Sequence, residues 1–462
     1  MSLPLGLRQA LAAAVGHERL LTDAADCFVY GYDNSRKHHL PDAVVFATTE
    51  IEVQMVVRAC RQHKTSLVAR GRGTGTTGAA VPLRGGIVLS LERMNQIVAV
   101  DPANRLMRVE PGTTNQEVQQ AASAHGFFWP PDPTSAAYCS VGGNIAVNSA
   151  GPRAVKYGTV RENTLGLHAV TGAGDIIRVG VSTTKGAVGY DLTRLLIGSE
   201  GTLAIITQAT LKLTPLASAK RTLRAVYDTM HHAAEAVSRI MAQPITPCAL
   251  EFLDGAAIGM VRAYSQALPE SAGALLLIEA DGPEAAMDEA VAALSHAASG
   301  PGLTSLMTAN TAAEATALWA VRKALSPALR TLAPNKLNED VVVPVSRIPE
   351  LIARLGELSQ KFGIPIVNFG HAGNGNIHVN LLYDSQNAEQ EAQARPCLSE
   401  VFDLVLLLDG TLSGEHGVGL EKRDYVGRAI DAPTLALMRA IKAQFDPDNI
   451  LNPDKLFPIT SS

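Results

Sequence analysis

The pattern of apolar and polar positions predicts that helices and strands alternate in the first half of the chain. Apolar side chains recur at mostly helical spacing over residues 48–64, and a short apolar run at 66–69 is typical of a strand. Strand-like runs follow at 86–91 and 105–110, and a helix is expected at 116–124. We therefore predict an α+β arrangement with mixed sheets.

Two strand-like runs with a short glycine-containing link predict a β-hairpin in the same half. Residues 165–171 and 175–180 flank Gly172-Ala173-Gly174, and small loop residues of this kind permit tight turns. Beyond residue 215 glycine becomes less frequent, and the elements expected there are the helices 230–241, 284–297, 312–326 and 433–445 and the strand 274–279. Pro327 is expected to end or kink the third of these helices.

These changes along the chain predict its domain organisation. A chain of 462 residues exceeds what one compact core usually supports. We expect a first domain over residues 1–217, a second over 218–440, and a C-terminal segment, 441–462, that returns to the first domain.

Composition and charge exclude several classes of protein. The chain is 47% hydrophobic and 18% charged with a net charge of −5, so it has no electrostatic footprint for nucleic acid. Its N-terminus reads as an amphipathic helix, not a signal peptide, and no apolar run reaches the roughly 18 residues that span a bilayer. The cysteines are odd in number and scattered, which argues against disulfides, a zinc knuckle or an iron–sulfur cluster: Cys27, Cys60, Cys139, Cys248 and Cys397. A reducing, cytoplasmic compartment is expected.

A glycine-rich loop follows the strand at 66–69. Residues 73–78 match the GxGxxG pattern, but a dinucleotide-binding turn of that kind must open a helix. Pro82 and the Gly85-Gly86 pair come next, so no helix is expected. The loop can instead turn successive backbone N–H groups toward a pyrophosphate, and the alternative is a flexible surface turn.

Two further segments are rich in small residues, and the first of them also contains rigid prolines. Residues 130–135 and 140–151 would suit a wall against a flat ligand, and residues 198–203 have the same character before an apolar strand. Three such loops close together in the sequence predict a long cofactor threaded between two subdomains.

A histidine pair in the second half predicts a metal site. Strands are expected at 364–370 and 377–383, and Asn374-Gly375 is a strong signal for a two-residue hairpin turn. With that turn, His371 and His378 face each other across the strands, and Asn380 points the same way. Glu415-His416, flanked by glycines, could supply a third ligand, which is the pattern of a catalytic metal site with an open position. The alternative is that the histidines are structural.

An arginine on an expected helix could hold a substrate carboxylate. Arg322 and Ser326 lie at i and i+4 on one face of the helix at 312–326, and Lys336 follows. Arginine offers two parallel donors to a carboxylate, although on spacing alone Arg322 could equally be a surface residue.

These motifs together resemble the vanillyl-alcohol oxidase superfamily. The loop at 70–78, PDPTS with SVGGNIAVNSAG, KYG at 156–158, GSEGTL at 198–203, HxGxGNxHxN and GEHG are similar to the branch that contains the glycolate oxidase catalytic subunit and the FAD-linked D-lactate and D-2-hydroxyglutarate dehydrogenases. The resemblance covers nearly the whole chain. It implies an α+β fold in which a two-subdomain FAD-binding domain is followed by an α+β cap domain with an antiparallel sheet.

The resemblance also implies the cofactors and their residues. FAD is expected to bind without a covalent bond, because the glycine-rich loop has no histidine, although His38 and His39 lie upstream. The implied FAD-binding residues are Arg70, Gly71, Gly73, Thr74, Gly75, Thr76, Thr77, Gly78, Pro131, Asp132, Pro133, Thr134, Gly142, Gly143, Asn144, Asn148, Ser149, Gly151, Tyr157, Gly158, Glu200, Gly201, Ile205 and Asn452. His371, His378 and Glu415 are the implied ligands of a divalent metal. Zinc is expected, and two nitrogens and one oxygen also suit manganese, cobalt or iron.

The implied activity is oxidation of a small D-2-hydroxy acid, such as D-lactate, glycolate or D-2-hydroxyglutarate, to the 2-oxo acid. Hydride passes to flavin N5, His416 is the general base, Asn380 lines the site, and the substrate carboxylate is held by Arg322, Ser326 and Lys336. The alternatives are an oxygen-using oxidase and a non-catalytic electron-relay subunit.

The expected partners follow from that activity and from the lack of cysteine motifs. Electrons would pass to a separate acceptor: a quinone, a cytochrome, an electron-transfer flavoprotein or an iron–sulfur subunit. The substrate, the acceptor and the metal stay open, as do a homodimeric assembly and a peripheral position at the inner face of a membrane.

Overall fold

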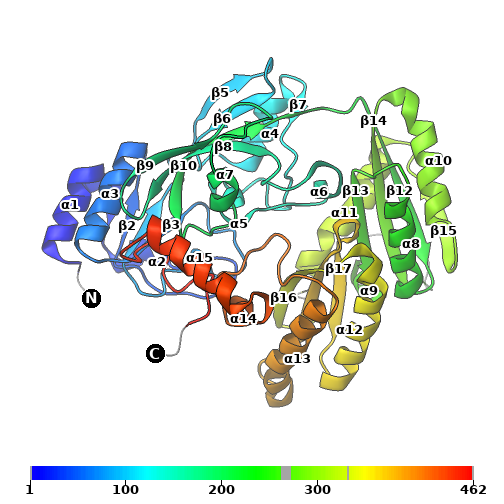
Figure 1. Ribbon diagram of the computed structural model, residues 1–462. Coiled ribbons are helices and arrows are strands. Elements are labelled where there is room, and N and C mark those ends of the chain that lie inside the picture. Colours follow the sequence, from blue (N-terminus) through cyan, green and yellow to red (C-terminus); the bar gives the residue numbers. More distant parts are fainter. Residues whose placement is uncertain (1–2, 262–271, 330–331, 460–462) are drawn as a thin grey trace. The chain divides into compact units, whose positions relative to one another are not determined.

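A computed structural model describes residues 3–261, 272–329 and 332–459, without the side chains of residues 261, 326 and 327. The chain divides into two units (Figure 1). The first comprises Met1–Ala150, Gly158–Leu216 and Glu415–Ser462, and the second comprises Gly151–Tyr157 and Ala217–Gly414. The return to the first unit therefore comes at Glu415, earlier than the expected residue 441. The cause is a set of backbone hydrogen bonds, described below, that no change in composition marks.

The first unit contains a four-stranded sheet in the order β1-β2-β4-β3, in which β2, β4 and β3 are parallel and β1 is antiparallel. Its strands are β1 (Leu20–Leu21), β2 (Ala43–Phe46), β3 (Leu67–Arg70) and β4 (Ile87–Ser90). Helices α1 (Leu5–Val15) and α3 (Glu50–Gln62) share an apolar core with it, and α2 (Ala24–Phe28) follows β1. In α3 the residues at helical spacing, Val53, Val56 and Val57, are fully buried, as the pattern predicts.

A second sheet in this unit is antiparallel throughout, in the order β5-β6-β10-β8-β9. Its strands are β5 (Ile97–Asp101), β6 (Leu106–Val109), β8 (Thr164–Thr171), β9 (Ile176–Gly180) and β10 (Ala204–Lys212). The predicted hairpin is confirmed, since Val170 pairs with Ile176. The remaining elements of the unit are α4 (Asn115–Ser123), α5 (Val141–Val147), α7 (Leu192–Leu196), α14 (Val426–Ala429), α15 (Ala432–Phe445), and the pair β7 (Phe127–Phe128) and β11 (Thr214–Pro215).

The second unit is built on a seven-stranded antiparallel sheet in the order β15-β12-β14-β13-β17-β18-β16. Its strands are β12 (Ala219–Tyr227), β13 (Ala249–Asp254), β14 (Ala274–Gly282), β15 (Leu303–Thr308), β16 (Asn335–Val342), β17 (Ile366–His371) and β18 (Asn376–Tyr383). The antiparallel sheet that the family resemblance implies for the cap is therefore present.

Helices cover both faces of this sheet (Figure 1). They are α6 (Ala154–Tyr157), α8 (Met230–Ala242), α9 (Gly255–Val261), α10 (Met287–Ala298), α11 (Ala312–Ala328), α12 (Ile348–Phe362) and α13 (Ala388–Leu407). On one face Tyr227 donates from its hydroxyl to the carbonyl of Ala298 in α10, over 2.6 Å. On the other face, Leu318 and Val321 of α11 share a core cluster with Phe369 of β17. The polar site described below lies on this second face.

Two local details bear on the sequence predictions. Helix α11 runs to Ala328, one residue past Pro327, where it was expected to end or kink. The expected helix at 284–297 begins instead as a 3-10 turn over Glu284–Ala286 and becomes α-helical at Met287. No helix among the described residues is long and apolar enough to cross a membrane.

Candidate active site

The histidine hairpin forms with a register that differs from the predicted one. His371 pairs with Asn376, and His378 lies opposite Phe369, so the turn comprises residues 372–375 and not Asn374-Gly375 alone. A 3-10 turn over Ala372–Asn374 precedes Gly375, which has a φ of +74°. A Cβ there would lie 1.8 Å from the carbonyl oxygen of Val343, so only glycine fits this turn.

The change in register leaves both imidazoles on one face. It shifts the pairing by two residues, and side chains alternate between faces with a period of two. His371 and His378 are therefore diagonal neighbours, with ring centroids 5.3 Å apart and planes nearly perpendicular. Both side chains are buried. The predicted pairing was wrong in register, whereas the predicted juxtaposition holds.

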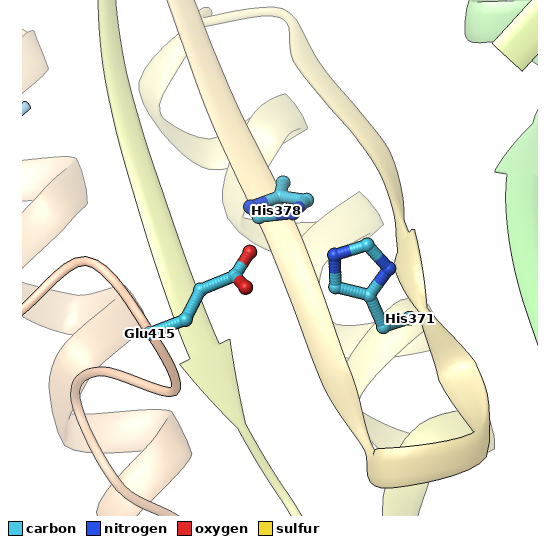
Figure 2. Close-up of side chains that lie close together, drawn as sticks. All are labelled: His371, His378 and Glu415. Carbon is cyan, nitrogen blue, oxygen red and sulfur yellow. The ribbon is translucent and has the colours of Figure 1, made fainter. Parts of the chain in front are cut away.

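Glu415 completes a group of three possible metal ligands. One ligand atom from each of His371, His378 and Glu415 lies within 4.8 Å of the other two. Figure 2 shows the Glu415 carboxylate and the two imidazoles pointing toward one another. Two imidazole nitrogens and a carboxylate oxygen form a donor set typical of catalytic zinc, and manganese, cobalt and iron accept the same donors. The residues present therefore fit a divalent cation.

Asp340 fixes the chain immediately before Glu415. It lies on β16 directly opposite His378, and its side chain is fully buried. Its carboxylate accepts hydrogen bonds from the Ser413 hydroxyl at 3.0 and 3.1 Å and from the Gly414 N–H at 3.0 Å. The Gly414 N–H also lies 2.8 Å from the Asp340 carbonyl oxygen. Glu415 is the next residue, so these contacts hold its backbone close to the strand that carries His378.

Glu251 is a buried residue of the site that sequence reasoning missed. Its side chain is fully buried on β13, where one oxygen lies 2.5 Å from His371 Nδ1 and the other accepts from Arg322 Nε at 2.6 Å. Burial works to raise the pKa of Glu251, but the neighbouring His371 and Arg322 outweigh it and lower that pKa below its usual value. A charged residue inside the apolar run Ala249–Asp254 was the signal available.

The expected carboxylate-binding residues lie on or over the same sheet face. Arg322, on α11, places its guanidinium carbon 4.9 Å from the centre of the Phe369 ring. Lys336 lies on β16 opposite Leu382, and the alternation of side chains places it on the face that carries His378 and Asp340. Ser326 belongs to α11, but its side chain lies outside the described residues.

Asn380 is held within the sheet. It is fully buried, and its amide donates to the carbonyl oxygens of Val367 and His378, both at 3.1 Å. Its amide oxygen accepts from the side chain of Asn338 on the neighbouring strand. Its hydrogen bonds therefore stiffen the hairpin next to His378.

In the first unit the three glycine-rich segments come together. A Cβ on Gly71 would lie 2.2 Å from Ser140 Oγ, so the loop at 70–78 lies against the start of α5. The N–H of Glu200 donates to the carbonyl of Ala146 at 2.8 Å, which joins the segment at 198–203 to the same helix. Asn452 donates its side-chain amide to the carbonyls of Ala79 and Glu200, at 2.9 and 2.7 Å. The C-terminal segment therefore also lies against these glycine-rich segments.

Two family descriptions match the chain. Residues 41–180 match the family described as FAD binding domain, and residues 216–456 match the family described as FAD linked oxidases, C-terminal domain. The chain belongs to the FAD-linked oxidase family. It is therefore an enzyme, an FAD-linked oxidoreductase with an FAD-binding domain.

The chain is similar to several relatives over most of its length. It is 38% identical over 453 residues to glycolate oxidase subunit GlcD of Bacillus subtilis, covering 98% of this chain and 96% of that one. It is 34% identical to D-2-hydroxyglutarate dehydrogenase of Xanthomonas citri pv. viticola, covering 98% and 96%. It is 37% identical to D-lactate dehydrogenase of Archaeoglobus fulgidus, covering 89% and 90%.

Solved structures show the fold of this FAD-linked oxidase. The 4-ethylphenol oxidase from Gulosibacter chungangensis has a TM-score of 0.78 at 17% identity, covering 99% of this chain and 98% of that one. A p-cresol methylhydroxylase has a TM-score of 0.77 at 19% identity, covering 97% and 95%. The fold is that of the vanillyl-alcohol oxidase superfamily, as its motifs predict.

Three of the residues expected to contact FAD also make other contacts within this oxidoreductase. Tyr157 belongs to the second unit, where its hydroxyl donates to Asp281 at 2.7 Å. The side chain of Ile205 is buried in the apolar core of the first unit, so any contact with FAD would come from its backbone. Arg70 is buried and donates to the carbonyls of Tyr32 and Val29, at 2.7 and 3.4 Å. The side chains of these three residues therefore make contacts that stabilise the protein itself.

Glu200 holds the chain just beyond His416. Its buried carboxylate accepts from the N–H groups of Val418 and Gly419, at 2.6 and 2.8 Å. Burial raises the pKa of Glu200, although these two amides and Lys455 oppose the shift. Thr77, in the glycine-rich loop, donates from its hydroxyl to the carbonyl of His416 at 3.4 Å. Residues 416–419 are therefore fastened to the first unit.

We expect Glu200→Ala to destabilise the protein by about 2 kcal/mol or more, because it leaves two backbone amides without their acceptor. Urea unfolding of the full chain with FAD bound would measure the loss. Thr202→Ala, which removes one hydrogen bond to the Ser199 carbonyl in the same segment, is the matched control and should cost about 1 kcal/mol. Equal stability of Glu200→Ala and wild type would contradict the anchoring role.

Proposed function

We propose that this oxidoreductase converts a small D-2-hydroxy acid to the 2-oxo acid with the help of a divalent cation. The observation that carries the proposal is the convergence of His371, His378 and Glu415. Arg322 contacts Glu251, the partner of His371, and Lys336 lies on the same sheet face. Cation ligands and fixed positive charges on one sheet face suit a substrate with a hydroxyl next to a carboxylate. The printed names of the relatives, which include glycolate oxidase and D-lactate and D-2-hydroxyglutarate dehydrogenases, support the same substrate class.

His371, His378 and Glu415 would hold the cation. A bound divalent cation supplies Lewis acidity, which makes a coordinated hydroxyl easier to deprotonate. Zinc is the metal we propose, and manganese, cobalt or iron would fit the same ligands. The hydrogen bond from His371 Nδ1 to Glu251 leaves Nε2 as the nitrogen of that ring that can reach a cation.

Arg322 and Lys336 would bind the carboxylate of the substrate, together with the hydroxyl of Ser326. Arg322 Nε is engaged by Glu251, so a paired contact with a carboxylate would use the guanidinium's other two nitrogens. Fixing both the carboxylate and the hydroxyl at C2 orients the C2 hydrogen, and such positioning lowers the barrier by removing rotational freedom before the reaction.

His416 is the proposed general base. It follows Glu415 directly in the chain, so a ligand of the cation and a base for the same hydroxyl come from adjacent residues. FAD, when bound, supplies the acceptor for the hydride from C2 at flavin N5. His416 would take the hydroxyl proton as that hydride leaves, which keeps charge from building up on the substrate.

The first unit would bind FAD without a covalent bond. The loop at 70–78 contains no histidine, and Gly73 and Gly78 have φ values of +64° and +78°, which permit its sharp turns. The five cysteines are buried and scattered along the chain, an arrangement that does not suit an iron–sulfur cluster. Electrons would therefore leave to a quinone, a cytochrome, an electron-transfer flavoprotein or an iron–sulfur subunit.

Anaerobic mixing with candidate substrates tests this function. We expect D-lactate, glycolate or D-2-hydroxyglutarate to bleach the flavin absorbance and L-enantiomers to leave it unchanged. A dye acceptor should then sustain turnover, and little hydrogen peroxide should form in air. Rapid peroxide formation would identify an oxidase, and a flavin that no 2-hydroxy acid reduces would refute the proposed function.

A further inference from the structure

We propose that Glu251 is a positioning residue that ties the metal site to the carboxylate-binding site, by orienting His371 with one oxygen and Arg322 with the other. This inference rests on the proposed function, because it concerns the residues assigned there to the cation and to the substrate. It adds a residue that neither the motifs of the sequence nor the names of the relatives bring into the site.

The geometry of Glu251 is that of a bridge. Its two carboxylate oxygens contact different partners, His371 Nδ1 at 2.5 Å and Arg322 Nε at 2.6 Å. The exposed fraction is 0% for the Glu251 side chain, 6% for His371 and 11% for Arg322. In such a buried place the bridge is screened little by solvent, so it constrains both partners more strongly than a surface contact would.

The contact with His371 decides which ring nitrogen can bind a cation. A carboxylate only accepts hydrogen bonds, so Nδ1 must carry the proton that points at Glu251. The lone pair is then on Nε2, which is the nitrogen left for the metal. A carboxylate behind a metal-binding histidine also raises the basicity of that ligand, and removing such a partner typically weakens metal binding by about 10–100-fold.

The contact with Arg322 holds the second partner in place. A buried carboxylate without a cation costs several kcal/mol, so Glu251 and Arg322 stabilise each other inside the unit. Phe369 lies below the guanidinium at 4.9 Å, and the same ring is 5.7 Å from the ring of His378. Arg322 is therefore packed between the carboxylate that orients one metal ligand and an aromatic ring beside the other.

Glu251→Gln tests the bridge with little change in shape. The glutamine amide presents one acceptor and one donor group to two donors, so one of the two contacts must be lost. We expect the dissociation constant for zinc to rise about 10–100-fold, measured by competition with a chromogenic chelator on the FAD-loaded full chain. At saturating zinc, KM for the 2-hydroxy acid should still rise more than kcat falls, because a neutral amide holds the Arg322 guanidinium less firmly than a carboxylate does.

Two further variants keep the test decisive if Glu251→Gln folds poorly. Arg322→Met should raise KM strongly but change the zinc dissociation constant less than about threefold, because Glu251 still contacts His371. The double variant Glu251→Gln with Arg322→Met removes both charges together and should still bind zinc about 10–100-fold more weakly than wild type.

Asp254→Asn is the matched control. Asp254 lies on the same strand and is equally buried, but it accepts from the backbone of Asn368 and Ala257 and contacts neither His371 nor Arg322. It should lower stability and leave the zinc dissociation constant unchanged. If wild type binds zinc and Glu251→Gln binds it equally well, the bridge is refuted while the proposed function stands. If wild type binds no divalent metal, the metal part of the proposed function fails first.

Discussion

Replacing His416 by alanine is expected to slow flavin reduction by about 10²–10⁴-fold, because a general base contributes a factor of that size to the reaction rate. The substrate hydroxyl would have to lose its proton to solvent while hydride leaves C2. Stopped-flow absorbance under anaerobic conditions measures this step directly, at saturating D-lactate. FAD content and the zinc dissociation constant should stay near wild type, because His416 is assigned to neither ligand set.

His125→Ala is the control for this experiment, because His125 is an exposed histidine of the same unit. It should reduce its flavin at the wild-type rate. A His416→Ala variant that also keeps the wild-type rate would remove His416 from the base role, whereas loss of FAD would show that the residue serves the fold. Partial recovery of the rate by added imidazole would support the base role independently.

The position of the histidine pair could be predicted from the sequence even though its register could not. Strand alternation depends only on whether a shift is odd or even, and the turn over residues 372–375 shifts the pairing by two. The sequence signal at Asn374-Gly375 is local, whereas the observed turn depends on the contact between Gly375 and Val343, which follows the end of β16. A turn propensity depends on the turn residues alone, so it does not include that contact.

Glu251 could not be predicted from motifs because its role depends on two strands and a helix. It reaches His371 through the pairing of β13 with β17, and it reaches Arg322 because α11 lies over that part of the sheet. The same reasoning explains why Arg322 could be placed on a helix face but not assigned a contact. A charged residue flanked by apolar residues in a strand is a sequence signal of such a buried polar network.

The division of the chain into two units could likewise be predicted only in part from the sequence. Helix periodicity predicted α3, α8 and α11 closely, because each buries one apolar stripe. The return to the first unit at Glu415 could not be predicted, since it depends on hydrogen bonds from Val418 and Gly419 to the distant Glu200. Backbone partners that are far apart in sequence leave no local pattern.

Glu415 and His416 are held by different parts of the protein. Asp340 fixes the backbone at Gly414, in the second unit, and Glu200 fixes it at Val418, in the first. The peptide that joins a proposed metal ligand to a proposed base is thus fastened on both sides.

Glu415→Gln is expected to lower turnover by about 10³-fold. Lewis-acid stabilisation by a bound cation amounts to several kcal/mol, and each 1.4 kcal/mol corresponds to a factor of ten in rate. The amide keeps the size of the side chain but loses the negative charge that, with His371 and His378, holds the cation. Elemental analysis of the purified variant should show less metal than wild type, and a chelator should abolish wild-type turnover until zinc, manganese or cobalt is restored.

Glu421→Gln separates this effect from a general loss of negative charge. Glu421 lies in the same C-terminal segment and pairs with Lys37 at 3.2 Å, away from the histidine hairpin. Neither side chain of this pair is fully buried, and Glu421 is assigned to neither the cation nor the substrate, so its loss should leave metal content and turnover unchanged. If wild type contains no metal and its turnover resists chelation, then His371, His378 and Glu415 serve the structure of the hairpin. The acidity of the substrate hydroxyl would in that case depend on His416 and on the nearby positive charges of Arg322 and Lys336.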